Sequence, residues 1–291
     1  MFATGPVATA VTLAVAEPVT LAITALRGGA GWTPAELTGL ALWLDAADSS
    51  TITLNGTDVS QWDDKSPNGY DLLQSTAAVQ PEYIASGLNG KPTIRTDGND
   101  RLDNTTSSLF RNVGVATWVA VAKYPVATGG TAAALLMCSR GDANNSARLI
   151  LTAATNTGEF MGVGGRRLDT DSFQTAASST PRIVDTWFFE VGQADYANAQ
   201  ANHWTNGVQD LTGAAFQTAG NTSDTNPLSV NVFGSTNILA PAGTEIAEVI
   251  AIEGPLTTAD RQKLEGYLAW KWGLEADLPA GHPYKTAPPT V

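Results

Sequence analysis

Three short stretches of the chain carry side chains whose types and spacing could do chemistry. Residues 97–104 (DGNDRLDN) are dense in oxygen donors, and a protein-bound calcium ion takes roughly six to eight oxygen ligands. His203 and Trp204 are neighbours, so an imidazole lies beside an aromatic ring that could pack on a sugar. Residues 248–253 (EVIAIE) hold a carboxylate at each end, and two carboxyl groups about 5 Å apart can hydrolyse a glycosidic bond.

The acidic stretches are more typical of turns than of metal sites. Residues 97–104 lack the calcium-loop spacing that ends in a bidentate glutamate, so the pattern favours an Asx-rich turn, with structural calcium as the alternative. Residues 142–145 are interpreted in the same way. For Asp63, Asp64 and Lys65 we expect turn chemistry or a local polar network. We therefore name no metal ligand and expect no cofactor.

The candidate glycan contacts are Trp204 and His203. Trp204 follows the polar pair Asn202 and His203 and is expected to be better exposed than the tryptophans within hydrophobic patterns, which are Trp43, Trp118, Trp187, Trp270 and Trp272. Even so, a buried Trp204 is the favoured interpretation, and the glycan contact is the alternative. His203 is expected to be a polar strand or loop residue rather than a catalytic base.

The common catalytic motifs are missing from the sequence. It contains no Gly-x-Ser-x-Gly elbow, and the single cysteine, Cys138, has no recognisable His and Asn partners. One cysteine also excludes an intrachain disulfide and a multi-cysteine metal centre. Residues 162–166 (GVGGR) lack the strand–loop–helix context of a phosphate-binding loop. We expect no catalytic residue and no enzyme.

The composition is that of an acidic globular protein. Of the 291 residues, 43% are hydrophobic and 15% are charged, so the chain can bury a substantial core. The 16 Lys and Arg against 28 Asp and Glu give a net charge of −12. Nucleic acids and anionic membrane surfaces both attract clustered basic residues, so neither is expected as a partner.

Short β-prone runs separated by turn residues dominate the chain from about residue 50 to about residue 255, and this spacing predicts an antiparallel sandwich or barrel. Examples are residues 117–122, 148–151, 186–191 and 247–252.

Helical signals lie at the two ends of the strand-rich region. Thr33, Pro34 and Glu36 form a short helix start. A later helix over residues 257–270 is expected to lie on a sheet through one face, which holds Leu264, Tyr267, Leu268 and the stem of Lys271.

The first 31 residues are apolar and carry two charges, Glu17 and Arg27. No basic region precedes the apolar run and Glu17-Pro18 interrupts it, so neither a signal peptide nor a membrane span is expected. Its β-prone residues favour two extended segments ahead of a glycine linker. We expect this arm to dock on another subunit, with a poorly ordered tail as the alternative. The expected assembly residues are Val7, Val11, Leu13, Val15, Val19, Leu21 and Ile23.

Two blocks of sequence go beyond generic β patterning. The first comprises residues 40–46 (LALWLDA), 59–69 (VSQWDDKSPNG), 80–83 (QPEY), 87–92 (GLNGKP) and 97–100 (DGND). The second comprises residues 246–250 (IAEVI), 256–261 (LTTADR), 265–274 (EGYLAWKWGL), 278–279 (LP), 282–284 (HPY) and 288–289 (PP). Together with TNGV at 205–208, they resemble the laminin-G-like, concanavalin A-like jelly-roll domains of bacteriophage and marine bacterial surface proteins. The resemblance covers roughly residues 36–289.

The resemblance implies an all-β fold, an antiparallel jelly-roll β-sandwich of the concanavalin A-like kind. A short N-terminal helix, one C-terminal helix and an extended N-terminal arm complete it. Enzymatic relatives of this fold, the laminarinase-type glycosidases, place Glu-x-Asp-x-x-Glu along one strand. Here Glu248 and Glu253 match the two ends, but Ile250 stands where the aspartate would be.

We expect two parts, an apolar arm with its glycine linker over residues 1–31 and a jelly-roll domain over residues 32–291. The leading hypothesis is a non-enzymatic virion structural protein of the extracellular phage particle, either a capsid decoration, a head fibre or a tail-associated subunit. Its expected partners are capsid, portal or tail subunits bound through the arm, further copies in a homotrimer, and a host surface glycan. The alternative is a secreted or surface carbohydrate-binding module, followed by a glycosidase.

Overall fold

The computed structural model describes residues 31–125, 133–139, 147–154, 160–181, 184–225 and 228–291. The expected arm up to residue 30, with its assembly residues, lies outside these ranges, as does the acidic stretch 142–145. Among the described helices, none is long and apolar enough to cross a bilayer.

The described chain forms an antiparallel β-sandwich, so the fold class expected from the sequence is confirmed. The first layer runs in the order β1 (Leu40–Asp45), β19 (Glu245–Glu253), β8 (Val115–Lys123), β13 (Trp187–Asp195), β14 (Gln200–Thr205) and β15 (Val208–Ala215). The second layer runs in the order β4 (Leu72–Leu73), β7 (Leu102–Ser107), β16 (Leu228–Val232), β9 (Ala133–Ser139), β10 (Ala147–Ala154), β11 (Phe160–Gly165) and β12 (Gln174–Pro181).

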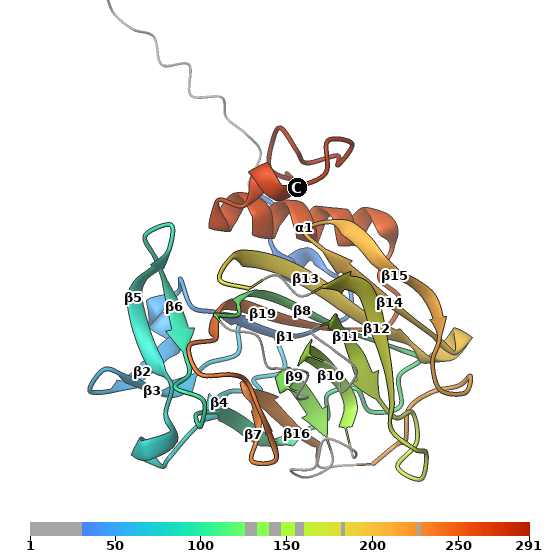
Figure 1. Cartoon of the computed structure of the whole chain (residues 1–291), viewed down its shortest axis with the longest axis horizontal. Coiled ribbons are helices and arrows are strands. Elements are labelled where there is room, and N and C mark those ends of the chain that lie inside the picture. The colour runs from blue at the N-terminus through green and yellow to red at the C-terminus, as the bar shows by residue number, and fades with distance from the viewer. Residues whose placement is uncertain (1–30, 126–132, 140–146, 155–159, 182–183, 226–227) are drawn as a thin grey trace, which may run out of the picture.

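A side wall connects the two layers and nearly closes the sandwich (Figure 1). From the first layer, β19 pairs with β6 (Lys91–Arg95), which pairs with β5 (Glu82–Leu88). From there the wall continues through β3 (Asp58–Trp62), which pairs with β5, with β2 (Ile52–Asn55) and with β4 of the second layer. A small separate hairpin consists of β17 (Gly234–Ser235) and β18 (Ile238–Leu239).

The main core fills the space between the layers. On β8, Trp118 and Ala120 point into this core, whereas Val119 and Val121 point outward to a second apolar cluster. Both faces of β8 are therefore buried, which explains why residues 118–122 form an unbroken apolar run rather than an alternating one.

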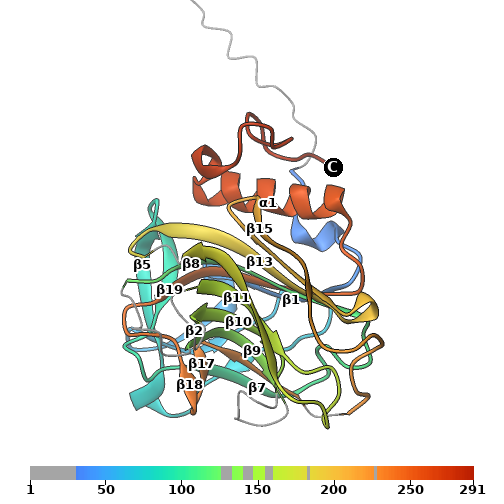
Figure 2. The ribbon, with the colours of Figure 1, turned by 45° about the vertical axis from the view of Figure 1, so that its right-hand side comes forward.

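The second apolar cluster lies beneath the helix α1 (Thr258–Trp272), which crosses the outer face of the first layer (Figures 1 and 2). The Thr257 side chain accepts a hydrogen bond from the Asp260 backbone N–H, and Gly273 ends the helix with a left-handed φ of 71°. Leu264 and Leu268 are buried against the sheet, so the expected helix and its apolar face are confirmed.

Local sequence signals set several shorter elements. The expected N-terminal helix is a single 3-10 turn, η1 (Pro34–Glu36), and the Thr33 side chain makes no capping bond. The Asn206-Gly207 pair has φ values of 49° and 77°, as the tight hairpin turn between β14 and β15 requires. Further 3-10 turns are η2 (Ser49–Thr51), η3 (Ala77–Val79), η5 (Tyr196–Asn198) and η6 (Glu275–Asp277).

Candidate functional site

His203 is fully buried inside the sandwich, facing the main core from β14. Its Nε2 lies 2.9 Å from Glu190 Oε2 on β13, and its Nδ1 lies 2.7 Å from Asp210 Oδ1 on β15. The Thr205 hydroxyl donates to the other oxygen of Asp210. Burial by itself lowers the pKa of His203, but the hydrogen bonds and negative charges of Asp210 and Glu190 outweigh it and raise the pKa to about 9.

Trp204 is also buried, on the opposite face of β14. Its side chain belongs to the apolar cluster under α1, and it is 9% exposed. The Arg261 guanidinium of α1 lies 4.6 Å from the centre of the Trp204 ring and covers it. The possible glycan contact of Trp204 and His203 is corrected, because both side chains are buried, as the sequence favoured for Trp204. His203 is the polar strand residue that the sequence suggested.

Glu248 and Glu253 of β19 lie on opposite faces of the sheet and do not form a pair. Glu248 points to α1, where it accepts hydrogen bonds from Trp43 Nε1 at 2.7 Å and Trp272 Nε1 at 2.6 Å. Glu253 points to the main core and accepts from the Phe110 backbone N–H at 2.5 Å. Glu248 thus anchors the helix to the sheet, and the strand lacks the geometry of a glycosidase carboxylate pair.

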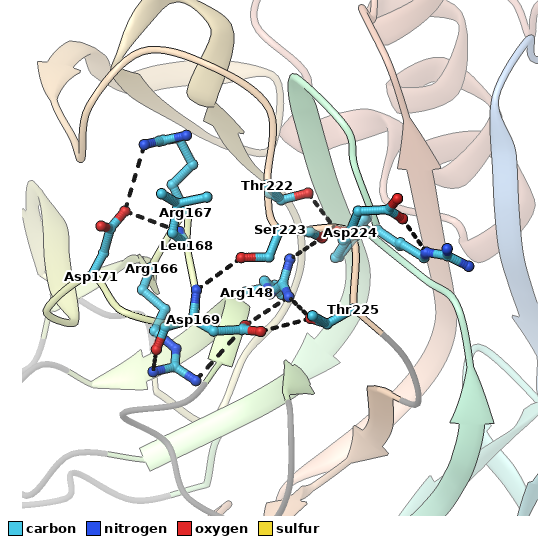
Figure 3. Close-up of polar contacts among 12 residues, drawn as sticks. Arg148, Arg166, Arg167, Leu168, Asp169, Asp171, Thr222, Ser223, Asp224 and Thr225 are labelled. Carbon is cyan, nitrogen blue, oxygen red and sulfur yellow. Dashed lines mark hydrogen bonds and ion pairs between the residues drawn. The ribbon is translucent and has the colours of Figure 1, made fainter.

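A buried arginine network fastens the loop before β16 to the second layer (Figure 3). Arg148 on β10 has no exposed surface, and its guanidinium donates to Asp169 Oδ1, Thr225 Oγ1 and the Ser223 carbonyl, each at 2.7 Å. Burial raises the pKa of Asp169, but hydrogen bonds from Thr225 and Arg148 outweigh it and lower that pKa. The network stabilises the fold and, because Arg148 is enclosed, presents no surface to a ligand.

The residues around Asp64 form the local polar network that was the alternative to a simple turn. Asp64 accepts hydrogen bonds from the backbone N–H groups of Trp43, Ser66 and Tyr70, at 2.8, 2.8 and 2.9 Å. Lys65 pairs with Asp45 of β1, at 3.0 Å. These bonds fasten the long connection after β3 to the first layer.

A polar cleft of about 620 Å³ opens on the side wall, and we take it as the candidate functional site. It lies between the β5–β6 hairpin, the turn η3, the turn after β6 and the loop at residues 242–243. The charged and amide side chains that line it are Asp58, Gln80, Glu82, Arg95, Asp97 and Asp100.

Strand register places three of these side chains in a row. Asp58 on β3 stands opposite Glu82 on β5, and Glu82 stands opposite Arg95 on β6. Residues directly opposite in an antiparallel pair share a face, so all three point into the cleft. Arg95 holds Glu82 through two guanidinium nitrogens, at 2.5 and 3.2 Å. The pair is about half exposed and thus accessible to a ligand.

The turn at residues 97–100 forms the other side of the cleft. It is part of the Asx-rich turn that the sequence favoured for residues 97–104, whose last three residues instead begin β7. Asp97 Oδ1 accepts from the Asn99 N–H at 3.0 Å, and Asp100 Oδ2 accepts from the Asp97 N–H at 2.7 Å. Burial, together with the nearby charge of Asp97, raises the pKa of Asp100 to about 6. A cleft carboxyl with a raised pKa is a marker of a functional site. Among the described residues, no group of three or more His, Cys, Asp or Glu side chains is arranged to hold a metal ion.

Sequence reasoning missed Asp58, Gln80, Glu82 and Arg95. A signal for Glu82 and Arg95 was present, because the Asn89-Gly90 turn predicts a hairpin whose arms bring these two residues opposite each other. Asp58 joins them through pairing of β3 with β5, which is not a hairpin connection and leaves no local pattern.

No family model matches the chain, and no curated protein matches its sequence. Solved structures do match its fold. A Trypanosoma rangeli sialidase in complex with sialic acid superposes with a TM-score of 0.51 and 15% identity, over 84% of this chain and 36% of that chain. Domain 4 of AbnA, a GH43 extracellular arabinanase from Geobacillus stearothermophilus in complex with arabinotriose, gives a TM-score of 0.53 and 15% identity, over 78% of this chain and 98% of that one.

The chain spans about a third of the length of the sialidases that it matches. At such identities the likeness shows the fold alone. It corrects the expectation that the chain is not an enzyme in one respect: part of a sialidase and one domain of an arabinanase share this fold, so the fold itself is compatible with an enzyme.

Proposed function

We propose that the chain binds a carbohydrate and that the polar cleft on the side wall is the binding site. This is the alternative that the sequence raised, a carbohydrate-binding module. Its support is the AbnA domain, which this fold matches over nearly its full length and which is described in complex with arabinotriose. The observation that carries the proposal is the cleft itself, with convergent polar side chains on a rigid β wall.

The cleft offers the hydrogen bonds that sugar hydroxyls need. A hydroxyl both donates and accepts, so it is satisfied by a carboxylate on one side and a guanidinium or amide on the other. Glu82, Asp97 and Asp100 supply acceptors, and Arg95 supplies donors in a fixed plane. The Arg95–Glu82 pair orients both groups before a ligand arrives, which reduces the entropy lost on binding.

The charge of the cleft favours an uncharged sugar over an anionic one. Carboxylates outnumber the single guanidinium in the lining, and that guanidinium is already paired with Glu82. A second anion placed about 5 Å from a carboxylate costs roughly 3 kcal/mol at an effective dielectric constant of about 20. A sialic acid or uronic acid carboxylate would meet this repulsion, whereas a neutral saccharide would not.

The test is a glycan array followed by calorimetric titration of a variant pair. The array carries neutral arabinan, xylan, glucan, mannan and galactan oligosaccharides together with sialylated and uronate oligosaccharides. Arg95→Met removes the cleft guanidinium. Arg111→Met is the matched control, because Arg111 is equally exposed at 41% against 42% and is likewise paired with a carboxylate, that of Asp224.

We expect a neutral oligosaccharide to bind, and Arg95→Met to weaken it by roughly tenfold or more, as loss of a charged hydrogen bond predicts. Arg111→Met should bind as the unaltered chain does. Binding to no neutral oligosaccharide, or equal loss in both variants, would refute the proposal.

The leading hypothesis from the sequence, a laminin-G-like subunit of a phage virion, rests only on the sequence resemblance over residues 36–289 and stays a prediction. In that case the arm would leave the sandwich at Gly31, whose backbone pairs with Thr290 in the C-terminal segment that packs on α1. Docking there would leave the side wall free to bind a host surface glycan. Deletion of residues 1–31 tests it, because unchanged incorporation into purified particles would contradict arm-mediated attachment.

A further inference from the structure

Two smaller clefts continue from the candidate site across the side wall to the edge of the second layer. The nearer has a volume of about 310 Å³ and shares Gln80 with the 620 Å³ cleft. The farther has a volume of about 470 Å³ and shares Leu73, Gln74 and Ser75 with the nearer one. The three clefts therefore form a row in which each neighbouring pair has walls in common.

The lining of the two smaller clefts is rich in uncharged polar side chains. Asn55, Ser60 and Gln61 line the nearer cleft, and Asn104 and Thr105 line the farther one. Amides and hydroxyls of this kind both donate and accept hydrogen bonds, as sugar hydroxyls do.

An exposed leucine separates the two smaller clefts. Leu73 is 50% exposed and is one of the few large apolar side chains on the described surface. Its strand, β4, pairs with β3 on one side and with β7 on the other, so Leu73 lies on the line between the clefts. An apolar group between polar clefts matches a saccharide chain, whose rings have C–H faces as well as hydroxyl edges.

The boundary between the large cleft and the nearer one is rigid. Gln80 is 6% exposed, and its amide is held at both ends. Its oxygen accepts from Asn55 Nδ2 at 3.0 Å, and its nitrogen donates to the Gln74 carbonyl at 2.5 Å. The clefts therefore keep their relative positions without a ligand, which favours recognition of one extended shape.

The row is longer than a single sugar ring. The smaller clefts extend from Asn55 on β2 across β3 and β4 to β7, and neighbouring strands in a sheet lie about 4.8 Å apart. Three such steps span roughly 14 Å, to which the large cleft adds its own width.

Building on the carbohydrate-binding function proposed above, we infer that the site takes an extended, uncharged oligosaccharide. One sugar occupies the cleft of Arg95 and Asp100, and the following sugars cross Gln80 and pass over Leu73 to reach Asn104 and Thr105. The chemical class of the ligand is thus a linear neutral oligosaccharide segment rather than a single terminal sugar.

The test compares ligand lengths and uses a matched apolar variant. The monomer, trimer and hexamer of the neutral series that binds best on the array are titrated against the unaltered chain, Leu73→Ala and Thr105→Ala. Val208→Ala is the control, because Val208 is equally exposed at 52% on β15 in the first layer. Thermal melting checks that every variant is folded, and Thr105→Ala probes the farther cleft independently of Leu73.

We expect affinity to rise at least tenfold from monomer to hexamer. Leu73→Ala should weaken hexamer binding by roughly fivefold, because the hexamer would bury the exposed half of the Leu73 side chain and alanine lacks that apolar surface. Monomer binding should be unchanged. Thr105→Ala should also weaken hexamer binding, and Val208→Ala should weaken neither.

Equal affinity for all three lengths would overturn the extended site while leaving the proposed function intact. If affinity still rises with ligand length in both Leu73→Ala and Thr105→Ala, the path over Leu73 to Thr105 is wrong. A loss of hexamer affinity in Val208→Ala equal to that in Leu73→Ala would also overturn this path. Absence of binding to every neutral oligosaccharide would instead refute the proposed function on which this inference rests.

Discussion

The buried His203 should make the stability of this protein fall as the pH rises through the neutral range. The imidazole lies between Glu190 and Asp210 with no exposed surface, and their hydrogen bonds and charges outweigh burial and raise its pKa to about 9. In the unfolded chain its pKa is about 6.5. Protonated His203 therefore stabilises the fold fully below about pH 6.5, and this contribution is lost as the pH rises to about 9.

The magnitude follows from the two pKa values. Each pH unit between them corresponds to about 1.4 kcal/mol, so the protonated imidazole contributes about 3 kcal/mol to the free energy of unfolding. A typical domain is stable by about 5–15 kcal/mol in total, so such a loss is measurable.

The assay is urea unfolding followed by tryptophan fluorescence at several pH values from 6 to 9.5. The unaltered chain should lose about 3 kcal/mol across this range. His203→Gln removes the titrating group, so we expect lower stability at pH 6 and a much flatter dependence on pH. Constant stability of the unaltered chain, or the same decline in His203→Gln, would refute the reasoning.

Three further predictions concern single residues. Glu248→Gln should lower the free energy of unfolding by about 3 kcal/mol, because Glu248 is a buried carboxylate bonded to two tryptophans. Asp224→Asn, at an exposed ion pair, should lower it by less than about 1 kcal/mol. Similar urea midpoints for the two variants would contradict this. Gly39→Ala should lower the melting temperature, because Gly39 has a φ of 82° and an added Cβ would lie 2.1 Å from the Glu253 carbonyl oxygen; an unchanged melting temperature would be inconsistent with that backbone. Glycan affinity should fall below about pH 6, where Asp100 becomes protonated and a weaker acceptor, and titration of Asp100→Asn should lack this change.

One side of the candidate site is predictable from the sequence, but most of its lining is not. The acidic stretch 97–104 predicts a turn, and the structure confirms Asx hydrogen bonds over residues 97–100. Arg95 and Glu82 lie in the arms of a hairpin that the Asn89-Gly90 turn predicts. Leu73 belongs to the site through the pairing of β4 with β3, and Gln80 through its contacts after the turn η3, and no local pattern encodes that proximity.

The possible glycan contact at His203 and Trp204 could not be decided from the sequence for a similar reason. Alternation along β14 correctly places the two side chains on opposite faces, as it does in any strand. Whether a face is covered depends on what packs against it. Here one face meets the second layer and the other meets α1, so both side chains are buried.

The local structure of this protein is encoded in short stretches of its sequence. Apolar runs of strand length, the Asn-Gly turns and the capped helix at residues 258–272 encode the antiparallel sandwich and its C-terminal helix. These features act over a few residues, where backbone sterics and short-range hydrogen bonds decide the outcome. The roles of the polar residues, by contrast, depend on how distant parts of the chain pack together. Glu248 bonds to the helix α1, His203 is buried between two carboxylates and Arg95 lines a cleft. These roles depend on burial and on charge pairing with residues that are far away in the chain.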